Sequence, residues 1–367
     1  MGSRFKIGGP QPEPRNLYFM YFRLSGFKIG RTMKSFLVIL LLTSVATTWA
    51  QNTTNMIEES FKIEILDNEA LNLIRPDSPI KIIGEGFKWT EGPLWIEEGN
   101  YLLFSDIPNN SVFKIDASGK LSTYLKPSGY LGEGDYGNEP GSNALLLDQQ
   151  GKLVLCQHGE RRMARMIAGL DDPKPEYEEI VGTFEGKRFN SPNDAVYDAF
   201  GNLYFTDPPY GLPKQMEDPR KELSFQGVYC LKTSGELMLV DKLSRPNGIT
   251  FSPDGTELIV SVSDPEHAVW YKYDIVEVGI VENKRLFFDS THLVDKEGYL
   301  GLPDGMKMHK SGNLFATGPG GLWILNQEGK AIARIHTGQA TSNSAFSRDY
   351  KRLFLTADDY VLEVSLN

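Results

Sequence analysis

Six side chains with an oxygen acceptor stand at the same point of six repeated sequence segments: Glu91, Asn143, Asn193, Asn247, Asp304 and Asn343. Carboxylate and amide oxygens are hard ligands, which suit Ca²⁺, Mg²⁺ or Mn²⁺. No Lys or Arg occupies this point in any segment, and buried carboxylates without partners are costly. A divalent cation would neutralise the two acids, and a bound ion with open coordination positions can act as a Lewis acid.

Two other interpretations of these residues are weaker. Asn and Asp are common before strands because they tolerate turn geometry, but that preference explains one or two matches better than six. The five histidines lack a zinc-ligand spacing such as HxxxH, and no GxSxG nucleophile elbow is present, which disfavours a serine esterase. We expect one divalent metal ion, with Ca²⁺ first and Mg²⁺, Mn²⁺ and Zn²⁺ as alternatives.

The segments that position these residues form one internal repeat. Each contains the polar residue, a short apolar strand pattern, a turn and a second apolar strand pattern. Five segments have a turn glycine eight positions after the polar residue, and Lys351 replaces it in the last segment. Segments about 40–55 residues apart with several strands have the size of propeller blades. We predict an all-β, six-bladed propeller whose inner strands line a channel, with the six polar residues in a ring.

The last segment lacks an outer strand, whereas two strand-like stretches, FKIEILDN and PIKIIGEG, precede the first segment. We expect one of them to complete the last blade, which closes the ring and removes an exposed sheet edge. An open solenoid would need polar caps, which are not apparent. Two long loops without strand pattern, 126–142 and 207–226, are candidate lids over one face.

The N-terminus contains the pattern of a secretory signal. A basic residue precedes an apolar stretch from Phe36 to Ala46, and small residues precede a cleavage site after Ala50. An uncleaved membrane anchor is the alternative. We expect an exported protein, periplasmic or secreted, with three parts: 1–32 a spurious or disordered extension, 33–50 the signal peptide, and 51–367 a single propeller domain.

Charge and cysteine content restrict the partners. Residues 1–50 carry a net charge of +6 and the whole chain −10, so the remainder is strongly acidic. Such a surface repels nucleic acid and anionic membranes. Cys156 and Cys230 lie within apolar strand patterns, which favours small buried side chains over a disulfide. We expect a monomer or weak dimer without nucleic-acid or membrane partners in its mature form.

Five ordered motifs resemble those of the gluconolactonase / senescence-marker-protein-30 family of sugar lactonases. They are EGPLW, SPNDAVYDAFGNLYFTDPPYG, RPNGITFSPDG, LPDGMKMHKSGNLFATGPGGLW and the weaker TSNSAF, and the resemblance covers roughly residues 85–366. It implies a six-bladed propeller and a divalent metal held by Glu91, Asn247 and Asp304. It also implies that Asp304 is the general base and that Asn193 contacts substrate.

The motifs depart from the family pattern at two positions. Animal members carry a sugar-binding Arg two residues before the equivalent of Asn193, where this chain has Ser191. Ser344 follows the Asn of the last motif, where a small residue or Cys is usual. The first difference indicates that the substrate differs from that of the animal proteins.

Further candidates for substrate binding are Asn143 and Asn343 of the ring, His158 after the second segment, and Tyr210 in DPPYG. His158 could equally be a structural histidine, and Tyr210 could serve packing alone. Arg161 and Arg162 could bind sugar hydroxyls or support a loop.

We expect a hydrolase that opens a gluconolactone-like aldonolactone. The reaction needs a polarised carbonyl, an activated water and a stabilised oxyanion, which a divalent ion beside a carboxylate can supply. One alternative is a non-catalytic propeller that binds a sugar or a protein, because propellers support many functions. Another is a promiscuous esterase or phosphotriesterase.

Overall fold

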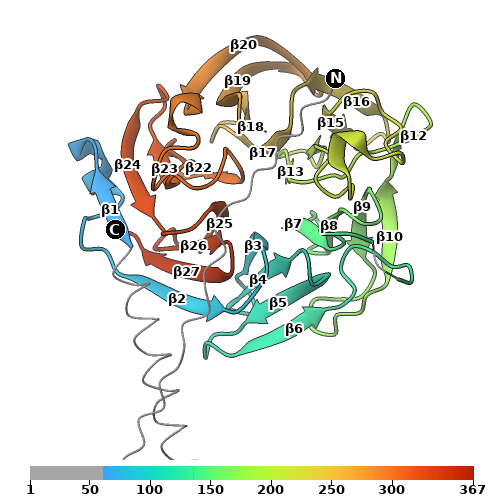
Figure 1. Ribbon diagram of the computed structural model, residues 1–367, viewed down its shortest axis with the longest axis horizontal. Coiled ribbons are helices and arrows are strands. Elements are labelled where there is room, and N and C mark those ends of the chain that lie inside the picture. The colour runs from blue at the N-terminus through green and yellow to red at the C-terminus, as the bar shows by residue number, and fades with distance from the viewer. Residues whose placement is uncertain (1–60, 135) are drawn as a thin grey trace, which may run out of the picture. The chain divides into compact units, whose positions relative to one another are not determined.

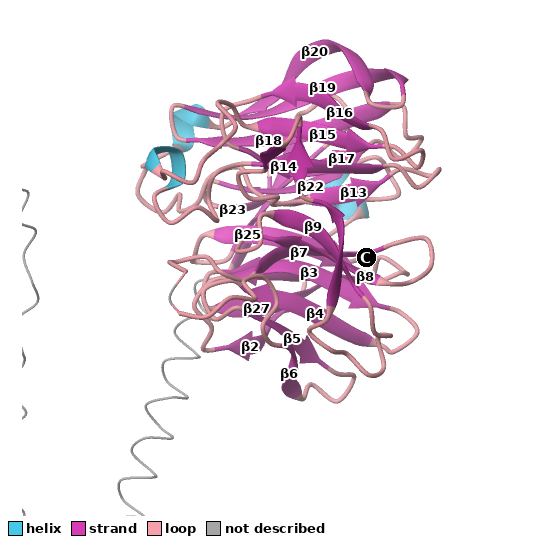
Figure 2. Ribbon diagram, turned by 90° about the vertical axis from the view of Figure 1, so that its right-hand side faces the viewer, coloured by secondary structure: helices cyan, strands magenta, loops and turns pink. Residues whose placement is uncertain are grey.

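The computed structural model describes residues 61–134 and 136–367. The expected extension, signal peptide and cleavage site lie outside these residues. The described chain forms six antiparallel sheets arranged around a central channel, and its side view is almost entirely strand and loop (Figures 1 and 2). The prediction of an all-β, six-bladed propeller is confirmed.

The strands of each blade follow one another in the chain, from the channel outwards. The first blade consists of β3 (Thr90–Ile96), β4 (Tyr101–Asp106), β5 (Ser111–Ile115) and β6 (Leu121–Leu125). The second consists of β7 (Ser142–Leu147), β8 (Leu153–Gln157), β9 (Arg162–Met166) and β10 (Tyr177–Val181). The third consists of β13 (Ala195–Tyr197), β14 (Leu203–Asp207), β15 (Gly227–Leu231) and β16 (Leu237–Lys242).

The remaining blades have the same order. The fourth consists of β17 (Pro246–Phe251), β18 (Glu257–Asp264), β19 (His267–Glu277) and β20 (Ile280–Asp289). The fifth begins with β21 (Met306–Met308), β22 (Leu314–Gly318), β23 (Gly321–Leu325) and β24 (Ala331–His336). The sixth begins with β25 (Thr341–Phe346), β26 (Arg352–Ala357) and β27 (Tyr360–Ser365). A separate hairpin pairs β11 (Thr183–Phe184) with β12 (Lys187–Arg188).

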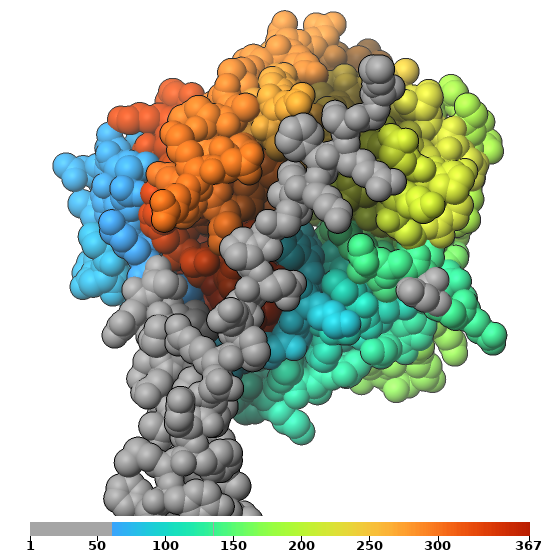
Figure 3. All heavy atoms as spheres, viewed as in Figure 1, coloured from blue at the N-terminus to red at the C-terminus, as the bar shows by residue number. Residues whose placement is uncertain are grey.

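N-terminal strands complete the last two blades. β2 (Ile80–Glu85) pairs antiparallel with β27, so that PIKIIGEG supplies the missing outer strand of blade six. β1 (Lys62–Ile65) pairs with β24 and adds a fifth strand to blade five. Figure 3 shows the blue N-terminal residues beside the red and orange ones of these blades. The predicted closure is confirmed, and the second upstream stretch also covers a sheet edge.

Contacts between inner strands close the ring, because β25 contacts β3 as well as β21. Apolar clusters fill the space between neighbouring sheets; one of them combines Leu155 of blade two with Leu103 of blade one. Cys156 and Cys230 are buried and free, as the strand patterns predict. The propeller is therefore stabilised by sheet-on-sheet packing, without a cross-link between these cysteines.

In four of the six blades, the glycine of the repeated turn takes a positive φ angle. Gly151, Gly201, Gly255 and Gly312 have positive φ angles, which glycine adopts without strain. In the first blade Asn100, rather than Gly99, takes the positive φ of 48°, and in the last blade Tyr350 does so at 62°. In the first blade Asn100 therefore takes the turn conformation that glycine takes in four other blades.

Helices are few and short in the described part of the chain: η1 (Asn68–Asn72), η2 (Gln215–Glu217) and η3 (Thr291–Leu293). None of them could cross a membrane.

Candidate active site

A cavity of about 800 Å³ opens at one end of the channel, and five ring residues line it: Glu91, Asn143, Asn193, Asn247 and Asp304. The inner strands run away from this end, because the cavity is lined by their first residues and by the loops that precede them. Asn343 is not among the lining residues; its amide donates to Glu91 Oε2 at 3.3 Å. The structure therefore brings together five of the six predicted ring residues at one cavity.

Backbone irregularities next to the ring residues aim them at the channel. The pairing register shifts between Glu91 and Leu94 in β3, and between Pro246 and Ile249 in β17. β7 and β25 have similar shifts beside Asn143 and Asn343. Bulges of this kind re-aim side chains and are frequent next to active sites.

Hydroxyl groups of one blade hold the backbone of the ring residue in the next blade; we call this set of hydroxyls the hydroxyl belt. In several blades a Ser or Thr hydroxyl of the second strand donates to the carbonyl of the next ring residue. These bonds join Ser105 to Asn143, Thr206 to Asn247 and Ser261 to Asp304, at 2.8, 2.6 and 2.8 Å. The sequence contains the signal, because a Ser, Thr or Cys follows every ring residue by 13 or 14 positions. Our sequence reasoning missed it.

Without a bound cation, burial and mutual repulsion disfavour the charged forms of the two ring carboxylates. Burial, followed by the negative charge of Asp194, raises the pKa of Glu91 to about 8. Burial, followed by the charges of Glu91 and Asp194, raises the pKa of Asp304 well above its usual range. A bound cation would reverse these shifts, because it compensates both the burial and the mutual repulsion.

Unsatisfied acceptors provide an independent test of whether a metal fits. Asn143 Oδ1, Asn247 Oδ1 and Asp304 Oδ1 are buried and have no hydrogen-bond partner within residues 61–134 and 136–367. They come from three blades and face the same cavity as Glu91. Buried acceptors without partners are rare in native proteins, and a hard divalent ion accepts this donor set. The residues therefore fit a metal, although the described residues contain no cluster of three His, Cys, Asp or Glu side chains.

A third buried carboxylate, Asp194, was not foreseen, although it lies in the SPND motif beside Asn193. Its Oδ1 accepts the Ala195 amide and its Oδ2 has no hydrogen-bond partner among the described residues. Burial raises the pKa of Asp194, and the positive charge of Lys307 opposes that shift. Lys307 donates to Asn343 Oδ1 at 3.4 Å. No Lys or Arg occupies the ring position itself, as the sequence shows, but Lys307 brings a positive charge close to the ring.

The predicted substrate residues divide into two groups. Asn193, Asn143 and Tyr210 line the cavity, and the Tyr210 hydroxyl donates to the Ser263 carbonyl at 3.2 Å. His158 is fully buried and, like Asn343, is not among the lining residues. Burial raises the pKa of Tyr210, so its hydroxyl stays protonated at neutral pH.

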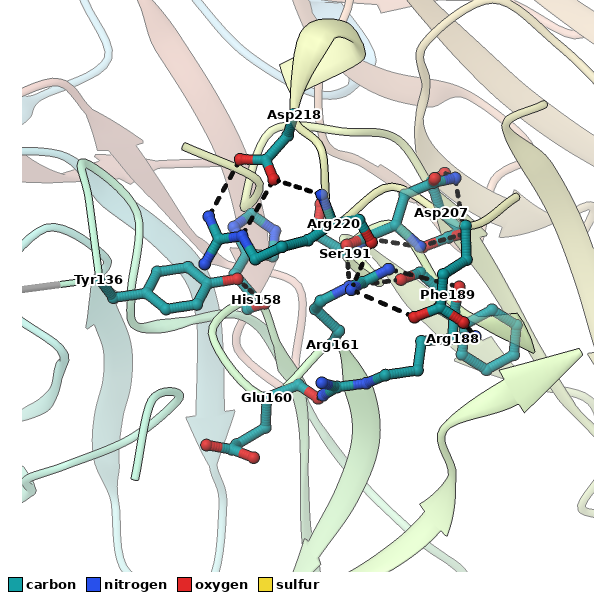
Figure 4. A network of polar contacts seen from close by, with 12 residues as sticks. Tyr136, His158, Glu160, Arg161, Arg188, Phe189, Ser191, Asp207, Asp218 and Arg220 are labelled. Atoms are coloured by element: carbon teal, nitrogen blue, oxygen red, sulfur yellow. Dashed lines mark hydrogen bonds and ion pairs between the residues drawn. The ribbon is translucent and has the colours of Figure 1, made fainter. Parts of the chain in front are cut away.

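Arg161 and Ser191 support loops rather than facing the cavity. The Arg161 guanidinium donates to backbone carbonyls, including Phe189 O at 2.7 Å and Arg220 O at 2.9 Å (Figure 4). The Ser191 hydroxyl donates to Pro208 O and accepts from the Gly211 amide. The Ser191 side chain therefore holds the start of the 207–226 loop, at Pro208 and Gly211.

Three loops form the wall of the cavity. Glu139 comes from the loop before β7, and Tyr210 and Gln215 come from the loop before β15. These are the two predicted lids. The third loop, between β20 and β21, supplies residues 294–302 and was not identified from the sequence. Trp89 and Arg245 also line the cavity and were missed.

Comparison with known proteins shows which family the chain resembles. The family model described as "SMP-30/Gluconolactonase/LRE-like region" matches residues 89–359. The gluconolactonase of Zymomonas mobilis is 38% identical over 293 residues, covering 78% of this chain and 81% of that protein. The diisopropyl-fluorophosphatase of Loligo vulgaris is 25% identical over 296 residues, covering 75% of this chain and 87% of that protein.

A solved structure shows the same arrangement. The gluconolactonase XC5397 of Xanthomonas campestris superposes with a TM-score of 0.71 at 26% identity, covering 83% of this chain and 95% of its own. The family model spans all five motifs, from the first blade to the last. The chain belongs to the SMP-30/gluconolactonase/LRE-like family.

Proposed function

We propose that this lactone-hydrolysing enzyme opens a sugar lactone, gluconolactone-like in its ring and hydroxyls, at one bound divalent ion, Ca²⁺ before Mg²⁺, Mn²⁺ or Zn²⁺. The observation that carries the proposal is the set of unpartnered oxygens of Asn143, Asn247 and Asp304 around one cavity. The 38% identity to a gluconolactonase supports the substrate class.

Glu91, Asn247 and Asp304 would hold the ion, with Asn143 and Asn193 on the same side of the cavity. When bound, the ion would supply Lewis-acid polarisation of the lactone carbonyl and electrostatic stabilisation of negative charge on the carbonyl oxygen. The Asn343 amide keeps Glu91 oriented through its bond to Oε2. The two carboxylates supply the charge, and the amide oxygens complete the ligand set.

Asp304 is the proposed general base. Its carboxylate lines the cavity, where one oxygen would hold the ion and the other would take a proton from an attacking water. Asn193, Asn143 and Tyr210 would orient the ring of the lactone beside Asp304.

A second candidate activity is hydrolysis of phosphotriesters. It is favoured by the 25% identity to a diisopropyl-fluorophosphatase over most of both chains. The same base and the same electrophilic site would serve an activated phosphorus ester. A non-catalytic sugar-binding propeller is disfavoured by the unpartnered base in the cavity.

A panel of sugar lactones, an activated aryl ester and a fluorophosphate, each assayed with and without chelator, tests the proposal. We expect the highest kcat/KM on an aldonolactone and loss of that activity with chelator. Activity that resists chelation, or a higher kcat/KM on the fluorophosphate, would contradict it.

Export follows from the N-terminal pattern and remains a proposal. N-terminal sequencing of the protein from its native host should give Gln51 as the first residue. A chain that starts at Met1 and stays in the cytoplasm would contradict export without affecting the enzymatic proposal.

A further inference from the structure

Glu139 is a carboxylate of the cavity that none of the five motifs contains. It lies in the loop between β6 and β7, its side chain is 29% exposed, and it lines the cavity together with Asp304 and Tyr210. Its negative charge contributes to the raised pKa values of both residues. Glu139 therefore faces the place that a substrate beside Asp304 would occupy.

The buried side chain of His158 holds Glu139. His158 Nδ1 lies 3.1 Å from Glu139 Oε2, and neither ring nitrogen has an aligned hydrogen-bond partner among the described residues. A buried imidazole without other partners gains most by donating to the one carboxylate within reach. Because a carboxylate accepts about four hydrogen bonds, Glu139 keeps free acceptor positions towards the cavity.

The surrounding backbone fixes this pair in place. The His158 amide donates to Gly141 O at 3.1 Å, so His158 binds the loop on both sides of Pro140. A side chain on Gly159 would collide with Pro140 O and Tyr130, and one on Gly211 would collide with the His158 ring. Tyr136 contacts the His158 carbonyl from the same loop (Figure 4). Both glycines thus allow two loops to pack directly against His158.

We propose that Glu139 is a substrate-specificity residue that accepts hydrogen bonds from ring hydroxyls of the lactone, and that His158 is its positioning residue. This inference rests on the proposed lactonase function and names the part of the substrate that Glu139 recognises. A neutral polyhydroxylated ring offers donors to a carboxylate, whereas a phosphate or carboxylate on the substrate is repelled. Apart from the two ring carboxylates, the cavity lining carries three acids, Glu139, Asp295 and Glu297, and two bases, Arg245 and Lys296, which agrees with this preference.

The test compares E139Q with E133Q, an exposed glutamate of the same loop, on glucono-1,5-lactone and on its 6-phosphorylated form. For E139Q we expect KM for the neutral lactone to rise about tenfold with kcat within about twofold, because a hydrogen bond to a charged group is lost. The preference for the neutral over the phosphorylated lactone should fall about tenfold. E133Q should match the parent protein.

The positioning role of His158 has its own pair of variants. H158N keeps a nitrogen donor close to the position of Nδ1, and H158L removes it at similar volume. H158N should keep most of the parent preference for the neutral lactone, whereas H158L should reproduce the KM of E139Q. Equal behaviour of H158N and H158L, with melting temperatures unchanged, would overturn the role of His158.

Two further measurements separate this inference from the lactonase proposal. Binding of 1,5-anhydroglucitol, in which a methylene replaces the carbonyl, can be followed by the fluorescence of Trp89, which lines the cavity. E139Q should weaken that binding about tenfold and leave metal affinity unchanged. Unchanged polyol binding and KM in E139Q, or a loss of metal affinity, overturns the role of Glu139 while lactone hydrolysis stands. A parent protein that neither binds the polyol nor hydrolyses lactones overturns both.

Discussion

The two ends of the channel are built by the same six inner strands but differ in chemistry. At the first end, the cavity of about 800 Å³ is lined by Glu91, Asp304 and three Asn side chains. At the other end, a cavity of about 550 Å³ is lined mainly by apolar residues such as Leu145 and Phe346, with Lys307 and Arg348 as its charged side chains. The first end attracts cations and the second repels them, so one fold supports a reactive end and an inert one.

Asn343 and Lys307 lie between the two ends. The Lys307 ammonium group donates to Asn343 Oδ1, and the Asn343 amide donates to Glu91. The polarity of the channel thus changes from positive to negative along a short chain of contacts. Five predictions test whether the difference between the ends determines function.

The largest effect should come from D304N. The substitution removes the base and a metal ligand, so kcat should fall by a factor of about 10²–10⁴ or more and should not recover with added metal. Steady-state kinetics across a metal titration measure this. Recovery of kcat at high metal concentration would show that Asp304 acts only as a ligand.

E91Q should have a smaller and reversible effect. It removes one of two ligand charges but leaves Asp304 in place, so metal affinity should fall by more than about tenfold. Activity should decline in step and partly return at high metal concentration. Isothermal titration calorimetry beside the assay checks this, and parent-like affinity in E91Q would show that Glu91 does not hold the ion.

Metal binding should strengthen as pH rises. Because burial raises the pKa of Glu91 to about 8, the metal must displace a proton below that pH, and affinity should increase up to tenfold per pH unit per displaced proton. Calorimetry in buffers of different ionisation enthalpy would detect the released proton. Affinity that is constant between pH 6 and 8 would contradict a protonated Glu91.

The raised pKa of Glu91 also predicts how the stability of the metal-free protein depends on pH. Glu91 holds its proton in the folded state up to about pH 8, whereas the ordinary pKa of a glutamic acid side chain is 4.5. The folded state therefore binds more protons between these values, and the free energy of unfolding of the metal-free protein should fall as pH rises through this window. Chemical denaturation at several pH values measures it, and added metal should oppose the decline.

The smallest effect should come from R348A at the opposite end. Arg348 is exposed and lines the second cavity, away from the ring oxygens. We expect kcat, KM and metal affinity within about twofold of the parent and a stability change within about 0.5 kcal/mol. A loss of metal affinity comparable to that of E91Q would remove the distinction between the two ends.

The sequence predicted the polar ring of the repeat but missed a second recurring feature of the repeat and the contacts outside it. The ring residues Glu91 and Asp304 were found because the same position recurs in every blade. The positions that supply the hydroxyl belt also recur, from Ser105 to Thr356 with Cys156 in blade two, but they resemble ordinary strand residues. The sequence did not predict which sheet β1 joins, because a strand pattern does not show which of two sheet edges the strand covers.

Glu139 and Trp89 could not be predicted, because their positions depend on loop packing rather than on the repeat. Glu139 lies in a loop where no periodicity applies, and its orientation depends on His158. Conversely, His158 was noticed as a histidine after a strand, but its burial behind Glu139 depends on the glycines around it. Local sequence patterns do not encode such contacts between loops.

The central claim, that a divalent ion binds between Glu91, Asn247 and Asp304, is tested most directly by anomalous diffraction from crystals grown with Ca²⁺ or Mn²⁺. We predict one peak per chain at the cavity end of the channel, about 2.1–2.6 Å from oxygens of these three side chains. A peak bound by other residues, or no peak in crystals of protein whose lactonase activity responds to metal, would contradict it.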